Sequence, residues 1–217
     1  MITKKGLHTR QKILDSAKKF FYENGYDATT VAQITDDAEV NIGLFIYYFG
    51  TKAEIATVIA MEYISQLRNL ISKKIFEQYG SYNLALGLAV EYRKNAEITM
   101  SDPNLLRFNV QRATPSNEQN LNHSHFSQLL KRLVNPAMTD QDVMLYEIVG
   151  IATVRSVYSA YYEKPDCFDQ KYLSDNLIRI CFTLLKLDTA QIEELLIKSQ
   201  EIADSISIRH IPYFTLS

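Results

Sequence analysis

The polar side chains best suited to contact another molecule gather in one N-terminal stretch of the sequence. Asn41, Tyr47 and Lys52 offer hydrogen-bonding groups, and Gly43 between them lets a backbone approach a partner closely. These residue types do not form the nucleophile-and-base pairing of a hydrolase, and the sequence has no glycine-rich phosphate loop and no Cys-x-x-Cys pair. The chemistry that they support is noncovalent binding, so we expect the chain not to be an enzyme.

Local signals place these residues at the starts of helices. Thr30 and Gln33 have the spacing of a capping box, which predicts that one helix begins at Thr30. Asn41 can cap a second short helix that carries Phe45, Tyr48 and Phe49 on one side. Because so few residues separate them, the two helices must cross steeply, as in a helix-turn-helix, whose second helix enters the DNA major groove.

Two further helices flank this pair. Upstream, an apolar stripe at helical spacing ends at Asn24-Gly25, a pair that favours a left-handed helix stop. The stripe consists of Ile13, Leu14, Ala17, Phe20 and Phe21. Downstream, Thr51 and Glu54 repeat the capping-box pattern and predict a long helix that runs to about Tyr79.

The first quarter of the chain resembles the DNA-binding domain of TetR-family transcriptional regulators. The resemblance lies in the order TRQKILDSAKKFFYENGYDATTVAQIT followed by VNIGLFIYYFGTKAEI. It implies an all-α protein with two domains. Residues 1–50 would form a three-helix helix-turn-helix DNA-binding domain with a basic N-terminal arm, and residues 51–217 a helical ligand-binding and dimerisation domain.

The helix-turn-helix supplies the residues expected to contact DNA. Tyr47 is the best-placed polar reader of base edges, whereas Tyr48 and Lys52 are expected at phosphates. Thr29 and Thr30 offer hydroxyl or amide groups to phosphate at the start of the supporting helix. The full expected set is Thr29, Thr30, Asn41, Ile42, Gly43, Leu44, Ile46, Tyr47, Tyr48 and Lys52.

Two departures from the family pattern change the expected mode of recognition. Ile42, Leu44 and Ile46 stand where polar or aromatic hydrogen-bonding residues are common. Ile and Leu contact thymine methyl groups but make no bidentate bond to guanine or adenine, so phosphate contacts, backbone amides and DNA shape should carry more of the recognition. Glu39 stands where the family usually has glycine, so the turn must accept a less favourable backbone.

Charge favours DNA binding only near the N-terminus. The chain has 23 Lys and Arg against 25 Asp and Glu, which is not the overall signature of a nucleic-acid-binding protein. A basic start nevertheless predicts a flexible arm that reaches phosphates. Its residues are Lys4, Lys5, Arg10, Lys12, Lys18 and Lys19. Asp36, Asp37 and Glu39 oppose DNA unless they are directed away from it.

Length and composition favour a soluble chain. Its 217 residues suffice for a small DNA-binding unit and one larger domain, and glycine and proline are few. Cys167 and Cys181 give no disulfide framework, the polar N-terminus is no signal peptide, and no apolar run approaches a membrane span. His123 and His125, two residues apart, lack the spacing of paired metal ligands on a helix. We expect a cytoplasmic protein with no cofactor, metal or membrane partner.

Caps and breaks divide the rest of the chain into further helices, and no strand-like alternation is present. The expected helix starts lie near Asp102, Thr139, Asp169 and Asp188. The ending SISIRHIPYFTLS is apolar for a tail, which predicts that it packs on the helical body.

Two of the expected helices carry more apolar and small residues than a monomer surface needs. Apolar side chains occupy nearly every side of segment 177–185, and small residues in segment 150–160 let another helix approach closely. We expect these helices to pair with their symmetry mates in a four-helix interface, as the resemblance also implies; a buried pair within one chain is the alternative. The expected interface residues are Ala152, Ser156, Ser159, Ile178, Cys181, Phe182 and Leu185.

The effector site is harder to locate in the sequence. In similar proteins the middle helices enclose the ligand cavity, and 14 Tyr and 10 Phe without Trp favour an aromatic, amphipathic pocket. The residues expected there are Tyr92, Phe108, Arg112, Phe126, Tyr146, Arg155 and Tyr158. Each of them is alternatively an ordinary core or surface residue. A buried Arg112 or Arg155 needs an anion, either a ligand carboxylate or phosphate or a neighbouring Glu.

The function expected from the sequence is a ligand-responsive transcriptional repressor. Its homodimer would bind a near-palindromic double-stranded DNA operator, from which an unidentified small-molecule effector releases it. The alternative is a non-transcriptional small-molecule-binding or interaction protein that keeps this scaffold but has lost operator specificity. The apolar second helix and the acidic turn motivate that alternative, and selection of bound fragments from random DNA separates the two.

Overall fold

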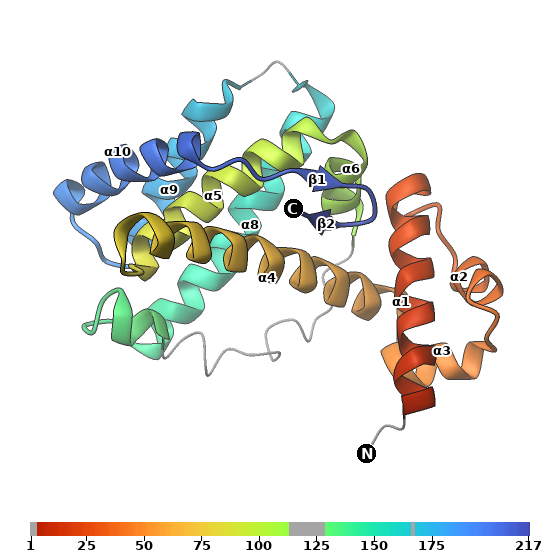
Figure 1. Ribbon diagram of the computed structural model, residues 1–217. Coiled ribbons are helices and arrows are strands. Elements are labelled where there is room, and N and C mark those ends of the chain that lie inside the picture. Colours follow the sequence, from red (N-terminus) through yellow and green to blue (C-terminus); the bar gives the residue numbers. More distant parts are fainter. Residues whose placement is uncertain (1–3, 113–128, 166–167) are drawn as a thin grey trace.

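The caps expected from the sequence set most helix boundaries in the computed structural model, which describes residues 4–112, 129–165 and 168–217 (Figure 1). Thr30, Thr51, Thr139 and Asp188 each cap a helix with a complete capping box. The boxes at Thr30 and Thr51 and the helix starts near Thr139 and Asp188 were predicted. Residues 129–133 form a short helical segment. The labelled elements are α1 (Lys4–Asn24), α2 (Val31–Asp37), α3 (Ile42–Phe49), α4 (Lys52–Tyr79), α5 (Leu84–Ser101), α6 (Pro103–Gln111), α8 (Asp140–Glu163), α9 (Gln170–Leu184), α10 (Thr189–Ser205), β1 (His210–Ile211) and β2 (Thr215–Leu216).

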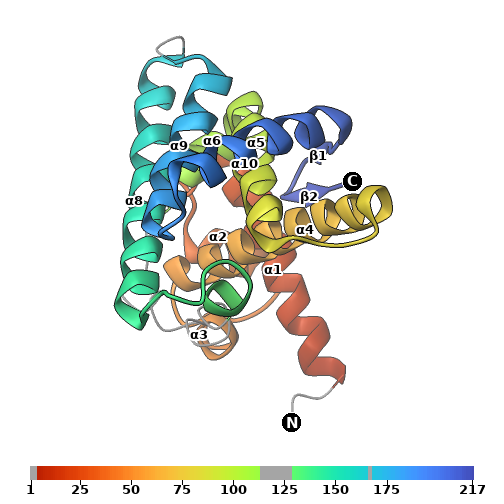
Figure 2. The same ribbon diagram turned by 90° about the vertical axis from the view of Figure 1, so that its left-hand side faces the viewer.

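Helices α1 to α3 form a unit at one end of the molecule, and α4 leads from it into a bundle of the remaining helices (Figures 1 and 2). One hydrophobic core runs from this unit through α4 to α5, α6 and the C-terminal residues. A second core lies among α5, α8, α9 and α10. Because the first core is continuous, the N-terminal unit is packed against the bundle and is not merely tethered to it.

Residues 210–216 form a two-stranded antiparallel hairpin, a small addition to the expected all-α fold, which is confirmed. His210 lies opposite Leu216, and Ile211 lies opposite Thr215. Strands of two residues are too short to show an alternating pattern in the sequence. The expected packing of this tail on the helical body is confirmed, because Phe214 is only 1% exposed and Gln66 of α4 hydrogen-bonds its carbonyl.

The basic N-terminal residues belong to a helix. Helix α1 begins at Lys4 and runs to Asn24. The prediction of a flexible basic arm is therefore wrong for residues 4–24. Lys12 pairs with Glu39 at 3.2 Å and Lys19 with Asp37 at 2.7 Å. The hydrogen bond from Lys19 holds the pKa of Asp37 below its ordinary value. Asp37 and Glu39 are therefore directed toward α1.

The turn between α2 and α3 has the unfavourable backbone expected for Glu39. Its φ is 55°, in the left-handed region that disfavours a residue with a Cβ atom. The turn is closed by hydrogen bonds from the Glu39 amide to the Asp36 carbonyl at 3.1 Å and from the Val40 amide to the Thr35 carbonyl at 3.0 Å.

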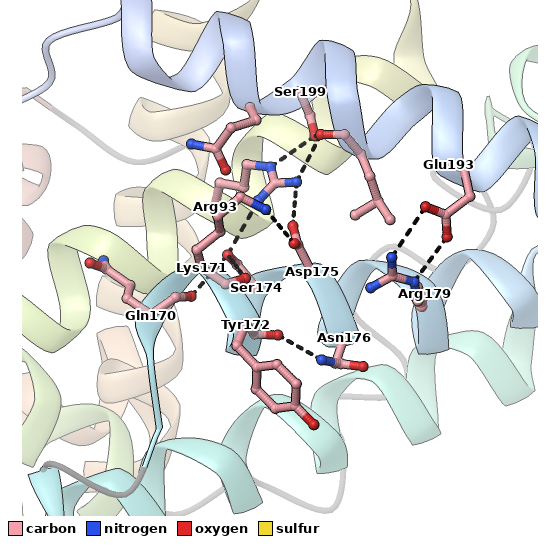
Figure 3. Close-up of polar contacts among 12 residues, drawn as sticks. Arg93, Gln170, Lys171, Tyr172, Ser174, Asp175, Asn176, Arg179, Glu193 and Ser199 are labelled. Carbon is pink, nitrogen blue, oxygen red and sulfur yellow. Dashed lines mark hydrogen bonds and ion pairs between the residues drawn. The ribbon is translucent and has the colours of Figure 1, made fainter.

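Arg93 of α5 joins three helices of the bundle in the interior (Figure 3). Its Nε donates to Ser199 Oγ at 2.9 Å and its Nη2 to the Leu196 carbonyl at 2.9 Å, both on α10. The same guanidinium pairs with Asp175 of α9 at 2.6 Å. Burial alone would raise the pKa of Asp175, but Lys171 and Arg93 together hold it below its ordinary value.

Candidate functional site

Helix α3 has one buried face and one exposed face. The Asn41 side chain accepts a hydrogen bond from the Leu44 amide at 3.0 Å, which caps the helix as predicted. Phe45 and Phe49 are buried in the core, so the opposite face points outward. The exposed residues are Asn41, Ile42, Gly43, Ile46 and Tyr47, of which Tyr47 is 74% exposed. Helix α3 thus offers an apolar and aromatic face to a partner.

The other expected contacts on α3 lie at the edge of this face. Leu44 and Tyr48 are half-buried, and the Tyr48 ring packs edge-on against Tyr47 with 4.9 Å between centroids. A Cβ atom on Gly43 would lie 3.2 Å from Asn41 Oδ1, so any side chain there would crowd the cap. The contacts of these residues with DNA stay predictions.

The two threonines before α2 lie in different environments. Thr29 is fully buried, and its hydroxyl donates to the Gly25 carbonyl at 2.7 Å. The predicted phosphate contact by Thr29 is therefore wrong, because this residue has no surface to offer. Thr30 is exposed at the N-cap, where its hydroxyl accepts a hydrogen bond from the Gln33 amide at 3.2 Å. Its contact with phosphate stays a prediction.

The Lys52 side chain is hydrogen-bonded to the loop between α1 and α2. Its Nζ donates to the Tyr26 carbonyl at 3.0 Å and to the Thr29 carbonyl at 2.9 Å. It also lies 4.3 Å from the centre of the Tyr26 ring, a cation–π contact. An ammonium has three donors, so a phosphate contact by Lys52 remains a prediction for the third.

A cavity of about 200 Å³ lies among α4, α5, α6, α8 and the hairpin. Its walls combine aromatic and aliphatic side chains with a few polar groups, as in sites that bind small organic molecules. Helices α4 and α5 contribute Ala60, Tyr63, Ile64, Tyr92 and Asn95, and α8 contributes Gly150, Ile151, Val154, Arg155 and Tyr158. The remaining lining residues are Leu105, Phe108 and Asn109 of α6, Arg112 directly after α6, and Phe214 of the hairpin.

Five of the seven residues expected at the effector site line this cavity. They are Tyr92, Phe108, Arg112, Arg155 and Tyr158. Tyr146 lies behind the wall, with its hydroxyl 3.2 Å from that of Tyr92. Phe126 lies outside the described residues. The contact of each residue with an effector stays a prediction.

The polar groups of the cavity are organised by hydrogen bonds between helices. Asn95 Nδ2 donates to the Tyr158 hydroxyl at 3.1 Å, which joins α5 to α8. Arg155 Nη2 donates to the Arg112 carbonyl at 2.9 Å, which joins α8 to the end of α6. Burial raises the pKa of Tyr92 and Tyr158, so both hydroxyls stay protonated at neutral pH. The cavity therefore offers hydroxyl, amide and guanidinium groups between aromatic walls.

Sequence reasoning missed several lining residues. Asn95 follows Tyr92 by three residues and so lies on the same face of α5, a spacing that points to it. Tyr63 lies within the long apolar pattern of α4, which does not separate a cavity wall from the core. Phe214 is far from α6 and α8 in sequence, and no local signal brings it to them.

The prediction that residues in and directly after α9 lie in the dimer interface is wrong. Ile178, Cys181, Phe182 and Leu185 are each 0% exposed and belong to the second core. Segment 177–185 is apolar on nearly every side because α5, α8 and α10 of the same chain all pack against α9. These four side chains therefore pack within their own chain, as in the alternative stated for them.

Helix α8 carries an exposed apolar face instead. Helical spacing places its large residues on one side, and each is at least 43% exposed. They are Met144, Leu145, Ile148 and Ile151. Ala152 and Ser156 are also exposed and Ser159 is half-buried, so their place in an interface stays a prediction. By length and composition α8 passes as a possible membrane span, which corrects the expectation that no such run exists, although helices of soluble proteins pass the same test.

Histidine and acidic side chains do not assemble a metal site in the part of the chain that the structure describes. No group of three His, Cys, Asp or Glu residues there is arranged to hold an ion. His123, His125 and Cys167 lie outside the described residues. His210 contacts the Asp102 carboxylate at 2.8 Å, and this contact ties the hairpin to the start of α6.

Comparison with known proteins identifies the N-terminal unit. Residues 13–59 match the family model of the bacterial regulatory proteins of the tetR family. The N-terminal unit is therefore a helix-turn-helix domain of the TetR type. The transcriptional regulator HbdR of Aromatoleum sp. is 46% identical over 46 residues, 21% of this chain and 20% of HbdR. The transcriptional repressor AcnR of Corynebacterium efficiens is 28% identical over 69 residues, 32% of this chain and 37% of AcnR. The chain thus matches well under half of the length of these curated relatives.

Solved structures share the TetR fold over nearly the whole chain. TylP, a TetR regulator from Streptomyces fradiae, has a TM-score of 0.50 and 20% identity, over 92% of this chain and 97% of TylP. RolR in complex with its ligand resorcinol has a TM-score of 0.57 and 17% identity, over 97% of this chain and 98% of RolR. At these identities the likeness shows the fold, an N-terminal helix-turn-helix domain followed by a helical C-terminal domain.

Proposed function

We propose that this TetR-family chain is a dimeric, cytoplasmic transcriptional repressor that a small molecule releases from a near-palindromic operator. Residues 1–50 would bind DNA, and residues 51–217 would bind the effector and the second subunit. The observation that carries the proposal is the course of α4 (Figure 1). This helix begins directly after the outward-facing α3 and then lines the cavity with Ala60, Tyr63 and Ile64. A ligand with different affinities for two positions of α4 therefore changes the position of α3.

The exposed face of α3 sets the mode of DNA recognition. Ile42 and Ile46, each 57% exposed, can contact thymine methyl groups, and the Tyr47 hydroxyl can reach base edges or phosphates. No arginine, lysine or glutamine lies on α3 to read guanine or adenine with two hydrogen bonds. We expect a low discrimination at each base pair, with DNA shape and phosphate contacts supplying the rest.

Selection of bound fragments from random double-stranded DNA tests this function. A repressor of this kind enriches one near-palindrome, because two-fold symmetry presents the same α3 face to both half-sites. Tyr47→Ala should abolish the enrichment, whereas Tyr79→Ala, at an exposed tyrosine on the far end of α4, should leave it unchanged. Failure of the unaltered protein to enrich any sequence contradicts the proposal.

The second subunit is expected on the exposed apolar face of α8. Contiguous apolar surface of this kind is unfavourable in water, and pairing two copies about a two-fold axis covers it on both. Ile148→Glu should therefore yield a single-chain mass in light scattering at micromolar concentration. The matched control Ile197→Glu, at an exposed isoleucine of α10, should keep a two-chain mass. A single-chain mass for the unaltered protein refutes the dimer.

The size and polarity of the cavity indicate the effector class. A cavity of about 150 Å³ holds benzene, so a cavity of about 200 Å³ suits one aromatic ring with polar substituents. Tyr92, Asn95 and Tyr158 suit ring hydroxyls, and the guanidinium groups of Arg112 and Arg155 suit a carboxylate or phenolate. Resorcinol, the ligand in the RolR structure, is a molecule of this size. We propose a hydroxylated or carboxylated monocyclic aromatic compound.

Calorimetric titration with resorcinol, phenol and salicylate tests this class. At least one probe should bind the full chain, and Tyr158→Phe should weaken binding about fivefold or more, because the ligand loses a hydroxyl partner. Tyr172→Phe, at an exposed tyrosine of α9, is the matched control. Binding of none of the three refutes the proposed class. A probe that tightens the DNA complex instead of weakening it indicates co-repression and contradicts release by ligand.

One observation favours a second candidate, a non-transcriptional binding or interaction protein on the same scaffold. The exposed face of α3 is apolar and aromatic, which also suits a protein partner. Under this candidate the random-DNA selection enriches nothing while a probe still binds the cavity. The two measurements together therefore separate the candidates.

A further inference from the structure

We propose that the C-terminal hairpin links the cavity to α1, so that filling the cavity alters the packing of the last turns of α1 through the hairpin. The hairpin comprises β1, β2 and the turn 212–214 between them. It lies beside α6 and faces the end of α1 in the ribbon (Figure 1). The regulatory meaning of this link rests on the proposed function, but the link itself is a physical property of the chain.

On one side the hairpin forms part of the cavity wall. Phe214 lines the cavity, is 1% exposed, and packs on Phe108, another wall residue, with 4.6 Å between ring centroids. Gln66 of α4 donates to the Phe214 carbonyl at 3.3 Å and accepts from the Leu216 amide at 3.2 Å. A close-packed wall of this kind transmits displacement, because aromatic side chains in contact have few voids between them. A molecule that fills the cavity therefore presses on the hairpin.

On its other side the hairpin packs against α1 and hydrogen-bonds to it. The Tyr22 ring of α1 packs edge-on against Tyr213 at 5.7 Å and against Phe214 at 5.8 Å between centroids. The Tyr213 hydroxyl donates to Glu23 Oε1 at 2.8 Å. Both contacts fall in the last turn of α1, directly before the loop to the helix-turn-helix pair.

A shared carboxylate joins the hairpin, α1 and α6 at one point. Asp102 Oδ2 accepts from the Tyr22 hydroxyl at 2.7 Å and contacts His210 Nδ1 at 2.8 Å. Asp102 Oδ1 accepts from the Leu105 amide at 2.9 Å and so caps α6. Burial alone would raise the pKa of Asp102, but these hydrogen bonds hold it below its ordinary value. The carboxylate is therefore ionised at neutral pH, and both of its oxygens can accept hydrogen bonds. Because all three bond to Asp102, a displacement of the hairpin, α1 or α6 alters the hydrogen bonds of the other two.

The turn of the hairpin is held in an unfavourable backbone conformation. Tyr213 and Phe214 have φ values of 68° and 61°, both in the left-handed region. For residues with a Cβ atom this conformation persists only where the surroundings fix it, and it is concentrated at functional sites. Here it places the rings of two successive residues in different contacts, Tyr213 against α1 and Phe214 against the cavity wall.

The test uses amide hydrogen exchange of the full chain and needs neither DNA nor effector. Val154→Phe fills the cavity from α8 and acts as a permanent occupant. It should change the exchange rate of the last two turns of α1 about fivefold, the lower end of common coupling between sites. In the background Tyr22→Phe/Tyr213→Phe, which removes both hydroxyl contacts but keeps the ring packing, the change should be clearly smaller than in the unaltered background.

One control and one further filling variant make the result specific. The background Arg179→Gln removes a surface ion pair between α9 and α10 and should leave the fivefold change intact. Ala60→Leu fills the cavity from α4 and should have the same effect as Val154→Phe. If Val154→Phe does not fold, Ala60→Leu takes its place in the experiment. An equal change in both backgrounds, or no change in α1 with either filling variant, overturns the link. Because the readout involves no DNA, failure of the repressor proposal would not produce either result.

Discussion

Replacing Arg93 with methionine tests whether the ion pair in the bundle interior holds α5, α9 and α10 together. Methionine keeps an unbranched apolar stem but removes every donor, leaving Asp175, Ser199 and the Leu196 carbonyl without this partner. Removing one partner of a buried pair costs about 3–5 kcal/mol of folding free energy. Because Lys171 still pairs with Asp175 at 2.6 Å, we expect the lower end, about 3 kcal/mol.

A second pair in the same region is the matched control. Arg179 of α9 pairs with Glu193 of α10 at 3.0 Å (Figure 3), but these side chains are 43% and 49% exposed. In contrast, the side chain of Arg93 is 4% exposed. Water screens the surface pair, so Arg179→Met should cost about 0–1 kcal/mol. The two variants thus remove the same functional group from two environments.

Urea unfolding followed by circular dichroism, at one fixed protein concentration, measures both losses. With a slope of about 2–3 kcal/mol per molar urea, the midpoint of Arg93→Met should fall by about 1–1.5 M. Arg93→Met/Asp175→Asn should recover part of the loss, because it also removes the charge left unpaired. Equal losses for Arg93→Met and Arg179→Met would refute the reasoning.

The pair also has a defined pH dependence. Because the folded-state pKa of Asp175 is lowered, its contribution to stability is complete above the ordinary carboxyl pKa of 3.8 and is lost as pH falls through the lowered value. Arg93→Met should therefore flatten the loss of stability in acid. An unchanged acid profile would show that other carboxylates dominate it.

Three further predictions concern single positions. Lys52→Met should cost about 2–4 kcal/mol in urea unfolding, because two carbonyls lose a charged donor, and should lower the slope of DNA affinity against salt by about one if its third donor contacts phosphate. Glu39→Gly should raise the free energy of unfolding by about 0.5 kcal/mol, since relief of the left-handed backbone outweighs the added chain entropy; a lower melting temperature would contradict this. A hydrogen bond from Lys186, with others from Thr139, lowers the pKa of Asp142 to about 2, so its contribution to stability persists above pH 3.8 and is lost near pH 2. Lys186→Met should move this pKa upward in an NMR titration.

Helix boundaries were predictable because their signals are local. Thr30 with Gln33 and Thr51 with Glu54 satisfy backbone amides within one turn, so four residues suffice to place each helix start. The exposed face of α3 followed from the same spacing, since Phe45 and Phe49 fix which side is buried. Thr29 was misplaced because its hydroxyl bonds to carbonyls nine and four residues earlier, contacts that no helix signal marks.

Exposure of the C-terminal helices was not predictable from composition. A helix that is apolar on all sides can meet a second subunit or its own neighbours, and segment 177–185 meets its own neighbours. Helix α8 instead carries an exposed apolar face, which includes Met144 and Ile148. The choice depends on which helices surround α9, and this is set by contacts between residues far apart in sequence.

The sequence by itself determined the all-α class, the caps, and the helix-turn-helix with its resemblance to the TetR family, because each depends on residues within a few turns of one another. Only the tertiary structure decided that Tyr92, Phe108 and Tyr158 share one cavity and that Phe214 closes it beside α1. Those residues lie on separate elements, and the Gln66 bond to the Phe214 carbonyl spans 148 residues of chain. Contacts at such separations depend on how whole helices pack, a property that no local pattern of residues encodes.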